Sequence, residues 1–271
     1  MYRHLLLIAL LTITNIYPSF AAEDEDRYSG YFENVSGDYS KTRVLEFWAY
    51  HDSHGDANYY DTLRLRYYQP LDFEHFRGTL RLDTSYVAAY GPAIPSDTAH
   101  QYQAGNTMLT FWGNHPGVMP HWGVNMGGRI VFPFGNNGQW AVGPQIGSSY
   151  RPTKESFIPL ADFSPLFRYM YGFDSKKNSF QNNPNQPPLV RNLQIYPTLG
   201  FQITPNTQIR MWDENGVLYN SAGGGWFVPI DAMVTHRFTK HLLLAVGASK
   251  QVVQTYNQYD WSLYGKVSLN F

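Results

Sequence analysis

The last eleven residues, Trp261-Ser-Leu-Tyr-Gly-Lys-Val-Ser-Leu-Asn-Phe271, alternate between two kinds of side chain. One face of this stretch carries Trp261, Leu263, Gly265, Val267, Leu269 and Phe271, and the other carries Ser262, Tyr264, Lys266, Ser268 and Asn270. A period of two is typical of a β-strand, whereas a helix needs a period of 3.6. Eleven residues also suffice for a strand that crosses a bilayer at a tilt. The stretch therefore predicts a transmembrane strand that is apolar outside and polar inside.

The same alternation recurs along the chain, and turn signals rich in Gly, Asn and Pro separate the repeats. We predict twelve strands, at roughly 42–51, 59–69, 77–89, 102–112, 121–132, 138–150, 160–172, 190–203, 207–213, 224–237, 241–250 and 259–271. The predicted fold class is all-β, a closed antiparallel transmembrane β-barrel of about 12 strands. An even number of strands leaves both termini on one side. The connections 52–58, 90–101, 173–189, 214–223 and 251–258 then face outside.

A secreted β-sandwich would also alternate. Three features favour the barrel: segments that are often ten or more residues long, alternation that continues to Phe271, and aromatic residues crowded at segment ends. Aromatic residues at strand ends are typical of the two interfaces of a membrane barrel.

The composition agrees with a membrane protein that spans by strands. Charged residues make up 15% of the 271 residues, below the roughly 25% of soluble domains, whereas aromatic residues reach 17%. The chain has no Cys, which excludes disulfide scaffolds and Cys-based metal sites. A net charge of −1 without basic runs argues against nucleic acid as a partner. No apolar run is long enough for a transmembrane helix.

The first 21 residues predict a secretory signal peptide. A basic start at Arg3 and His4, an apolar stretch at 5–16 and small residues at Ser19 and Ala21 match its three parts. We expect cleavage after Ala21, an N-terminal lead-in at 22–41 and the barrel at 42–271. The expected location is the outer membrane of a Gram-negative bacterium. Its lipid is one partner, and the barrel assembly machinery, through the strand ending in Phe271, is another.

Parity places ten charged residues on the inner face. They are Glu46, Arg64, Arg66, Arg81, Asp83, Arg129, Arg168, Arg210, Asp231 and Lys266, seven basic and three acidic. Charges that face hydrocarbon would be costly, so these side chains are expected to line water or to pair. The favoured function is a narrow passive channel for small solutes with a basic lumen and no cofactor. We expect Arg64, Arg66, Arg81 and Arg129 to be the principal lining residues.

Two alternatives remain without an open pore. In the first, arginine–carboxylate pairs plug the barrel. In the second, the plugged barrel acts as a surface adhesin or scaffold through the loop 173–189, which is rich in Asn, Gln and Pro.

A possible catalytic group lies in His51-Asp-Ser-His-Gly55. His51 and Ser53 share the lipid-facing parity, and so does Asp61 on the next segment. Ser, His and Asp supply the nucleophile, base and orienting acid of acyl transfer. The alternative function is therefore an outer-membrane acyl hydrolase. No paired-His spacing predicts a metal site.

The same five residues resemble the His-x-Ser-Asn-Gly signature of the outer-membrane phospholipase A family. The resemblance implies that His51 is the base and Ser53 the nucleophile. The chain departs from the family in four ways. His54 replaces the Asn of the signature, and Leu65 stands where the family has its orienting Asn. The family's basic stretch with Ser and Trp after the motif is absent, and the motif lies near the N-terminus rather than in mid-chain.

A second resemblance covers residues 194–271. It rests on an ordered series of motifs: Gln194-Ile-Tyr-Pro-Thr-Leu-Gly-Phe201, Gly225-Trp-Phe-Val-Pro-Ile230, His236-Arg-Phe238 and Asp260-Trp-Ser-Leu263 continuing to Phe271. The series resembles the outer-membrane channels associated with meta-pathway phenol degradation. The resemblance implies a barrel that acts as a transport channel, and it transfers no site residues.

Overall fold

The described part of the chain is almost entirely β-strand. The computed structural model describes residues 41–55, 57–73, 76–92, 94, 99–116, 122–134, 139–150, 152, 159–175 and 190–271. Within them the strands are β1 (Val44–Ser53), β2 (Tyr59–Phe73), β3 (Phe76–Tyr90), β4 (Gln103–Pro116), β5 (Trp122–Phe132), β6 (Gln139–Tyr150), β7 (Leu160–Ser175), β8 (Arg191–Thr204), β9 (Thr207–Met211), β10 (Val217–Asn220), β11 (Trp226–Arg237), β12 (Leu242–Gln254) and β13 (Trp261–Asn270). None of the described residues forms a helix that is long and apolar enough to cross a membrane.

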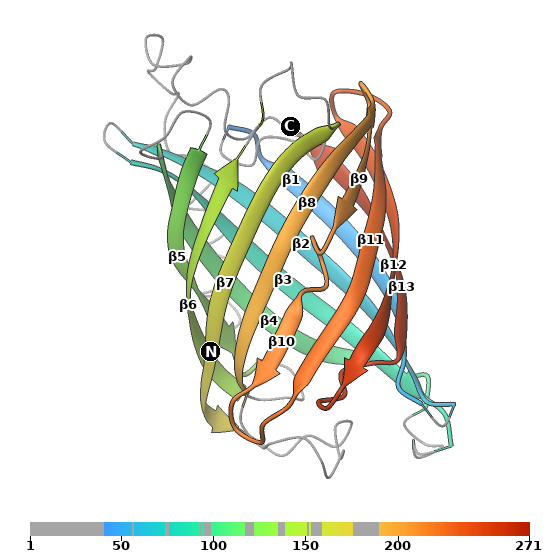
Figure 1. Ribbon diagram of the computed structural model, residues 1–271. Helices are drawn as coiled ribbons and strands as arrows, with labels where there is room; N and C mark the ends of the chain where they lie inside the picture. The colour runs from blue at the N-terminus through green and yellow to red at the C-terminus, as the bar shows by residue number, and fades with distance from the viewer. Residues whose placement is uncertain are drawn as a thin grey trace, which may run out of the picture.

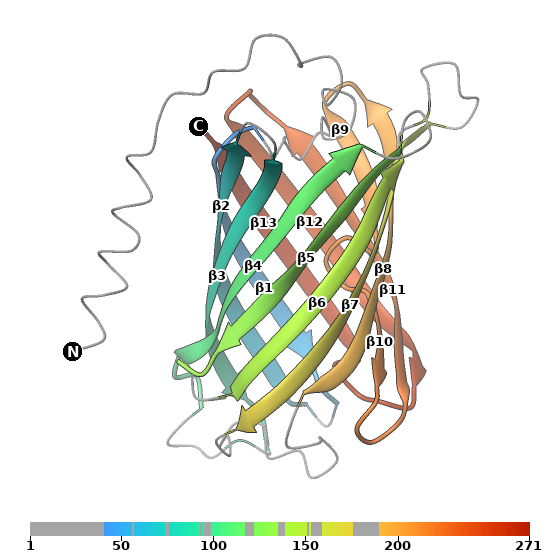
Figure 2. The same cartoon turned by 90° about the vertical axis from the view of Figure 1, so that its left-hand side faces the viewer.

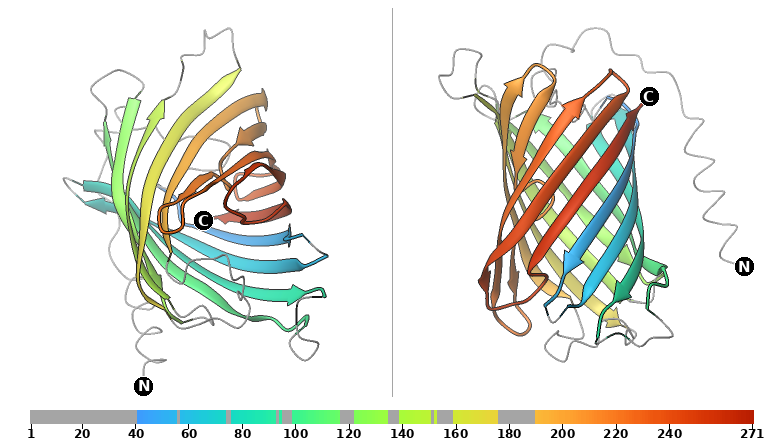
Figure 3. Two further views of the ribbon diagram at one scale, coloured as in Figure 1. Left: turned by 60° about the horizontal axis from the view of Figure 1, so that its bottom comes forward. Right: turned by 90° about the vertical axis from the view of Figure 1, so that its right-hand side faces the viewer.

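The strands form one closed antiparallel barrel with a pronounced tilt (Figures 1 and 2). β1 pairs with β13 along its whole length, from Val44 opposite Asn270 to Ser53 opposite Trp261. Figure 3 shows this closure, with the blue first strand beside the red last strand. β9 and β10 both lie between β8 and β11, so they share one position in the wall. The barrel is therefore twelve-stranded, as the alternation predicts.

One predicted connection is wrong. The sequence places 214–223 outside the barrel, but the strand β10 occupies 217–220 and pairs with both neighbours. The residues 212–216 leave the wall toward the interior, and the chain then rejoins the sheet. Only the turn 221–225 connects β10 to β11.

The two faces of the wall differ in the way that a membrane barrel requires. Large apolar side chains are exposed on the outer face, among them Val246 at 72% and Phe47 at 50%. The carboxylates of Glu46, Asp83 and Asp231 lie on the inner face and are fully buried. This arrangement reverses that of a soluble protein and is typical of a wall in contact with lipid.

Both ends of the described barrel lie at one edge, the upper edge in Figure 1. The backbone amide of Arg43 donates to the carbonyl of Phe271, and the amide of Phe271 donates to the carbonyl of Arg43. The short connections 205–206 and 238–241 lie at this same edge. The predicted signal peptide, and all of the predicted lead-in except Lys41, lie outside the described residues.

Candidate functional site

A cavity of about 610 Å³ occupies the interior of the barrel. The alternation of the strands points charged side chains into it from both halves of the chain. Seven of the ten residues predicted for the lumen line the cavity: Arg64, Arg66, Arg81, Arg129, Arg168, Arg210 and Lys266. The other three, Glu46, Asp83 and Asp231, are fully buried on the inner face. The structure thus brings all ten to the inside of the wall.

The residues 212–216 form a loop that projects into the lumen, here called the inward loop. Met211 pairs with Leu199 and Val217 pairs with Ile195. Five residues therefore lie between Met211 and Val217, whereas only three residues of β8 lie between their partners. Such an excess on one strand forces the backbone out of the sheet. Trp212 turns the chain with a φ of 51°, and its indole Nε1 donates to the carbonyl of Pro229 at 2.9 Å.

Glu214, at the centre of the inward loop, reaches the wall formed by β1 and β2. Its carboxylate accepts hydrogen bonds from Tyr50 Oη at 2.7 Å and Arg64 Nη1 at 3.2 Å. It also accepts from Arg66, through Nη2 at 2.7 Å and Nη1 at 2.8 Å. Since β1 and β2 are far from β9 around the barrel, this contact bridges the lumen.

Two further contacts fix the inward loop to its own side of the barrel. Asp213 Oδ1 pairs with Arg210 Nη2 at 3.1 Å. Asn215 Nδ2 donates to Asp231 Oδ1 at 3.0 Å, and Tyr264 Oη donates to the same oxygen at 2.7 Å. The loop is therefore held from several directions, and it narrows the lumen.

Further ion pairs on the inner face lie within one strand, between neighbouring strands or across an intervening strand. Asp83 accepts from Arg66 Nε and from Arg81 Nε, each at 2.8 Å. The other two pairs, each at 2.8 Å, are Arg210 Nη1 with Asp162 Oδ1 and Lys266 Nζ with Glu46 Oε1. Removing one partner of a buried pair costs about 3–5 kcal/mol, because the other charge is left unpaired.

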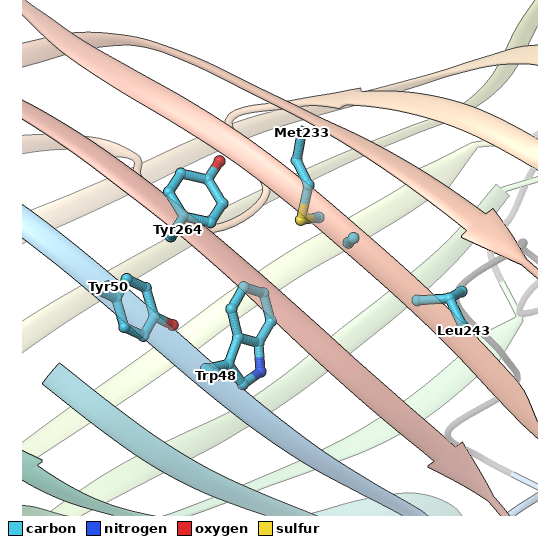
Figure 4. Close-up of a cluster of buried hydrophobic side chains, with 6 residues drawn as sticks. Trp48, Tyr50, Met233, Leu243 and Tyr264 are labelled. Atoms are coloured by element: carbon cyan, nitrogen blue, oxygen red, sulfur yellow. The ribbon is translucent and has the colours of Figure 1, made fainter.

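Aromatic side chains cover part of the same inner wall, as Figure 4 shows. The ring of Tyr50 stacks on Trp48 at 5.7 Å and on Tyr264 at 5.9 Å between centroids. The guanidinium of Arg66 lies 4.5 Å from the centroid of Trp48, and the ammonium of Lys266 lies 4.8 Å from it. These cation–π contacts hold both cations against the wall.

The lumen holds four acidic residues beyond those predicted from the sequence. Asp52, Asp162, Asp213 and Glu214 line the cavity as well. Asp162 shares the parity of Arg168, and Asp52 that of Glu46, so the alternation itself could have identified these two. Asp213 and Glu214 could not be identified in this way, because a polar Asp-Glu-Asn-Gly stretch predicts an outside turn. Together with Glu46, Asp83 and Asp231, the acidic residues of the lumen equal the seven basic residues in number.

The positive charge is nevertheless unevenly balanced. Within the part of the chain that the structure describes, no carboxylate forms an ion pair with Arg129 or Arg168. Arg129 Nε donates to Thr110 Oγ1 at 2.9 Å. Arg168 donates to the amide oxygens of Gln145 and Gln194 at 2.8 to 3.0 Å. The wall formed by β4 to β8 therefore presents uncompensated positive charge to the cavity.

The predicted catalytic group is only partly assembled. On the outer wall His51 Nδ1 lies 2.7 Å from Asp61 Oδ1 and 3.1 Å from Tyr90 Oη. The imidazole also stacks on Tyr59 at 5.3 Å between centroids. Among the described residues, Ser53 makes no side-chain hydrogen bond to His51. Two residues on the same face of a strand are about 7 Å apart, so Ser53 does not extend the pair into a triad.

Two other predictions concern a metal site and the outer loop 173–189. The structure describes no group of three His, Cys, Asp or Glu residues that could hold a metal ion. Of the predicted outer loop 173–189, Phe173–Ser175 continue β7, and the rest lies outside the described residues.

The sequence matches no protein-family model and no curated protein. Solved structures do match. The COG4313 outer membrane channel from Pseudomonas putida F1 aligns with a TM-score of 0.63 at 12% identity, covering 88% of this chain and 100% of that chain. The fold is that of an outer-membrane β-barrel.

Other barrels align less well. The β domain of the Bordetella autotransporter BrkA gives a TM-score of 0.50 at 11% identity, over 85% of this chain and 99% of that chain. The NanC porin gives a TM-score of 0.49 at 10% identity, covering 84% of this chain and 98% of that chain. At these identities the similarity concerns the fold alone.

Proposed function

We propose that the protein is an outer-membrane channel through which small polar solutes, and anions in preference to cations, diffuse passively. The observation that carries the proposal is the charged cavity of about 610 Å³ enclosed by an apolar outer wall. A wall of this kind is stable in lipid, and a cavity of this kind is stable when it contains water.

The location follows from the same proposal. The chain resides in the outer membrane of a Gram-negative bacterium after removal of residues 1–21. The barrel assembly machinery recognises the last strand, which ends in Phe271. The lipid then surrounds the band of exposed apolar side chains that includes Phe47 and Val246.

The inward loop limits the size of the solute. Glu214 crosses the lumen to Arg66, and the rings of Tyr50 and Tyr264 stack against the wall beside this contact. A solute must pass this constriction or displace the loop. The channel is therefore selective for small solutes.

The preference for anions depends on Arg129 and Arg168 more than on the other cations. The charges of Arg64, Arg66, Arg81, Arg210 and Lys266 are compensated by carboxylates within the lumen. A low-dielectric wall focuses the field of the remaining charges into the water of the cavity. Arg129 and Arg168 supply that field on the side of β5 to β7, whereas Asp52 and Asp231, the lumen carboxylates without an ion pair among the described residues, lie on β1 and β11.

The test is single-channel conductance of the refolded mature protein in a planar bilayer with a KCl gradient. We expect steady openings with anion selectivity, and a reversal potential that shifts toward cations when Arg129→Gln and Arg168→Gln are combined. Lys250→Gln is the matched control, because Lys250 is exposed on the outer wall. A correctly folded but silent barrel contradicts the channel, and an unchanged reversal potential contradicts the anion preference.

One observation favours a second candidate, the acyl hydrolase: the short contact between His51 and Asp61. In that case the detergent-solubilised protein hydrolyses phospholipid and Ser53→Ala abolishes the activity while the fold stays intact. We expect no such activity, since Ser53 is not joined to His51 by a hydrogen bond within the described residues. A Ser53-dependent hydrolysis would replace the channel as the principal function.

A further inference from the structure

We infer that Arg129 and Arg168 form a binding site for one small oxyanion, a carboxylate or a phosphate, on the inner wall of the barrel. The inference deepens the proposed function and rests on it for the route by which the anion enters. The binding itself is a property of the folded barrel and can be measured without transport.

The register brings the two side chains to the same part of the wall. Arg129 on β5 lies opposite Gly143 on β6, and Arg168 on β7 lies opposite Gln145, two residues further along β6. The side chains of Met170 and Arg168 both pass over Gly143, where an added Cβ would lie 3.2 Å from Arg168 Cδ and closer still to Met170 Sδ. The absence of a side chain at Gly143, opposite Arg129, thus leaves room for the stem of Arg168.

The charged groups around Arg129 are mainly cationic. Arg81 on β3 and Arg129 on β5 both lie opposite Thr110 on β4, and Arg81, Arg129 and Arg168 all line the cavity. Asp83, two residues from Arg81 on β3, already accepts from both Arg66 and Arg81 at 2.8 Å. Among the described residues it forms no ion pair with Arg129.

Neutral side chains hold both guanidinium groups in place. Arg168 donates three hydrogen bonds to the amide oxygens of Gln145 and Gln194, and its guanidinium lies 5.8 Å from the ring centroid of Tyr196. Arg129 uses only Nε, toward Thr110. Its two Nη groups have no acceptor among the described residues, and Arg129 lines the cavity.

This combination suits an anion. Two cations in a partly buried site repel each other, and the repulsion strengthens as the local dielectric constant falls. A carboxylate or phosphate would relieve it and would meet planar donor groups that can bind two of its oxygens at once. The neutral amides already fix Arg168, so little side-chain order remains to be lost on binding.

The test is isothermal titration of the folded, full-length mature protein in detergent, in a low-salt buffer free of oxyanions. One titrant is inorganic phosphate and the other is succinate. We expect one site per chain. Binding of both probes indicates a general oxyanion site, and binding of one alone identifies phosphate or carboxylate as the ligand chemistry.

Substitutions assign the site. Arg129→Gln and Arg168→Gln should each weaken binding at least tenfold, while Lys250→Gln on the outer wall leaves it unchanged. If Arg168→Gln does not fold, as judged by heat-dependent gel mobility, Arg168→Lys replaces it, because it keeps the charge and loses the planar fork. Absence of binding by both probes, or binding that neither position affects, overturns the inference.

The outcome is separable from that of the proposed function. A barrel that conducts ions but binds neither probe refutes the oxyanion site alone. A barrel that binds a probe through Arg129 and Arg168 but never conducts retains the site and refutes the channel.

Discussion

Replacing Glu214 by Gln should loosen the constriction and increase anion selectivity. The carboxylate of Glu214 accepts four hydrogen bonds, from Tyr50, Arg64 and twice from Arg66. Gln keeps the size of the side chain and removes its charge. Arg66 still pairs with Asp83 after the change, but Arg64 loses its ion pair with a carboxylate.

The effect on stability follows from these contacts. Breaking a buried pair from one side costs about 3–5 kcal/mol. We expect a loss near the lower end, about 3 kcal/mol, because Arg66 retains Asp83 and hydrogen bonds to charged groups contribute about 1.5–3 kcal/mol each. Urea unfolding in lipid vesicles measures this loss.

The effect on selectivity follows from Coulomb's law. For an ion that passes about 5 Å from the carboxylate in water, the lost interaction is about 0.8 kcal/mol, or about fourfold in occupancy. At 0.01 M salt the screening length is about 30 Å, so the change in occupancy is still about threefold for each ion. Since the occupancy of anions rises and that of cations falls, the ratio of anion to cation permeability should rise about tenfold.

The assay is the reversal potential at low salt, with single-channel noise as a second readout of the loosened loop. Asp72→Asn is the matched control, because Asp72 is an exposed carboxylate near the barrel edge, paired with Arg77. If Glu214→Gln and the control give the same conductance and the same reversal potential, Glu214 does not face the permeation path and the reasoning is refuted.

Two further predictions concern the outer wall and an outer loop. Val246 is 72% exposed on the apolar face. Val246→Arg on β12 should therefore lower the free energy of unfolding in lipid vesicles by about 2–4 kcal/mol, the cost of an arginine that faces lipid near the bilayer centre. An equal loss for Thr239→Arg in an edge turn would contradict a lipid-facing Val246. In the loop after β1, burial lowers the pKa of His54 from 6.5 to about 4, and its ring packs edge-on against Tyr60 at 4.3 Å. The unfolded loop therefore binds more protons between these two values, so the loop should lose stability as the pH falls from 6.5 toward 4. Hydrogen exchange of the Asn58 amide, which donates to Gly55, should show this loss in the wild type and not in His54→Phe; the same pH dependence in both would contradict it.

The pairing of the inner charges illustrates how far the sequence could lead. Parity alone put Glu46 and Lys266 inside, yet they are 220 residues apart, and their 2.8 Å contact exists only because β13 closes on β1. The same holds for Arg66 and Glu214, which are 148 residues apart. Alternation indicates which face of the wall a side chain lies on, but it does not indicate which strands pair around the barrel.

The inward loop could not be predicted for a different reason. The stretch Trp212-Asp-Glu-Asn-Gly216 carries the polar and Gly residues of an ordinary turn. Those residues suit an outside loop and an inward excursion equally well. The pairing of β9 and β10 with the same two neighbours decided between them. The predicted outer connection 214–223 was wrong because local composition does not indicate whether a turn projects outside the barrel or into its lumen.

The sequence by itself determined most of the strands, the twelve-stranded class and the inward side of the ten charges that parity assigned. These follow from a local rule, since successive residues of a strand point to opposite faces and only one face tolerates charge in lipid. Only the tertiary structure decided which charges are neutralised, because closure and the inward loop join residues from distant strands. Compensation of Arg64, Arg66 and Arg81, and its absence at Arg129 and Arg168, is the physical result of that joining.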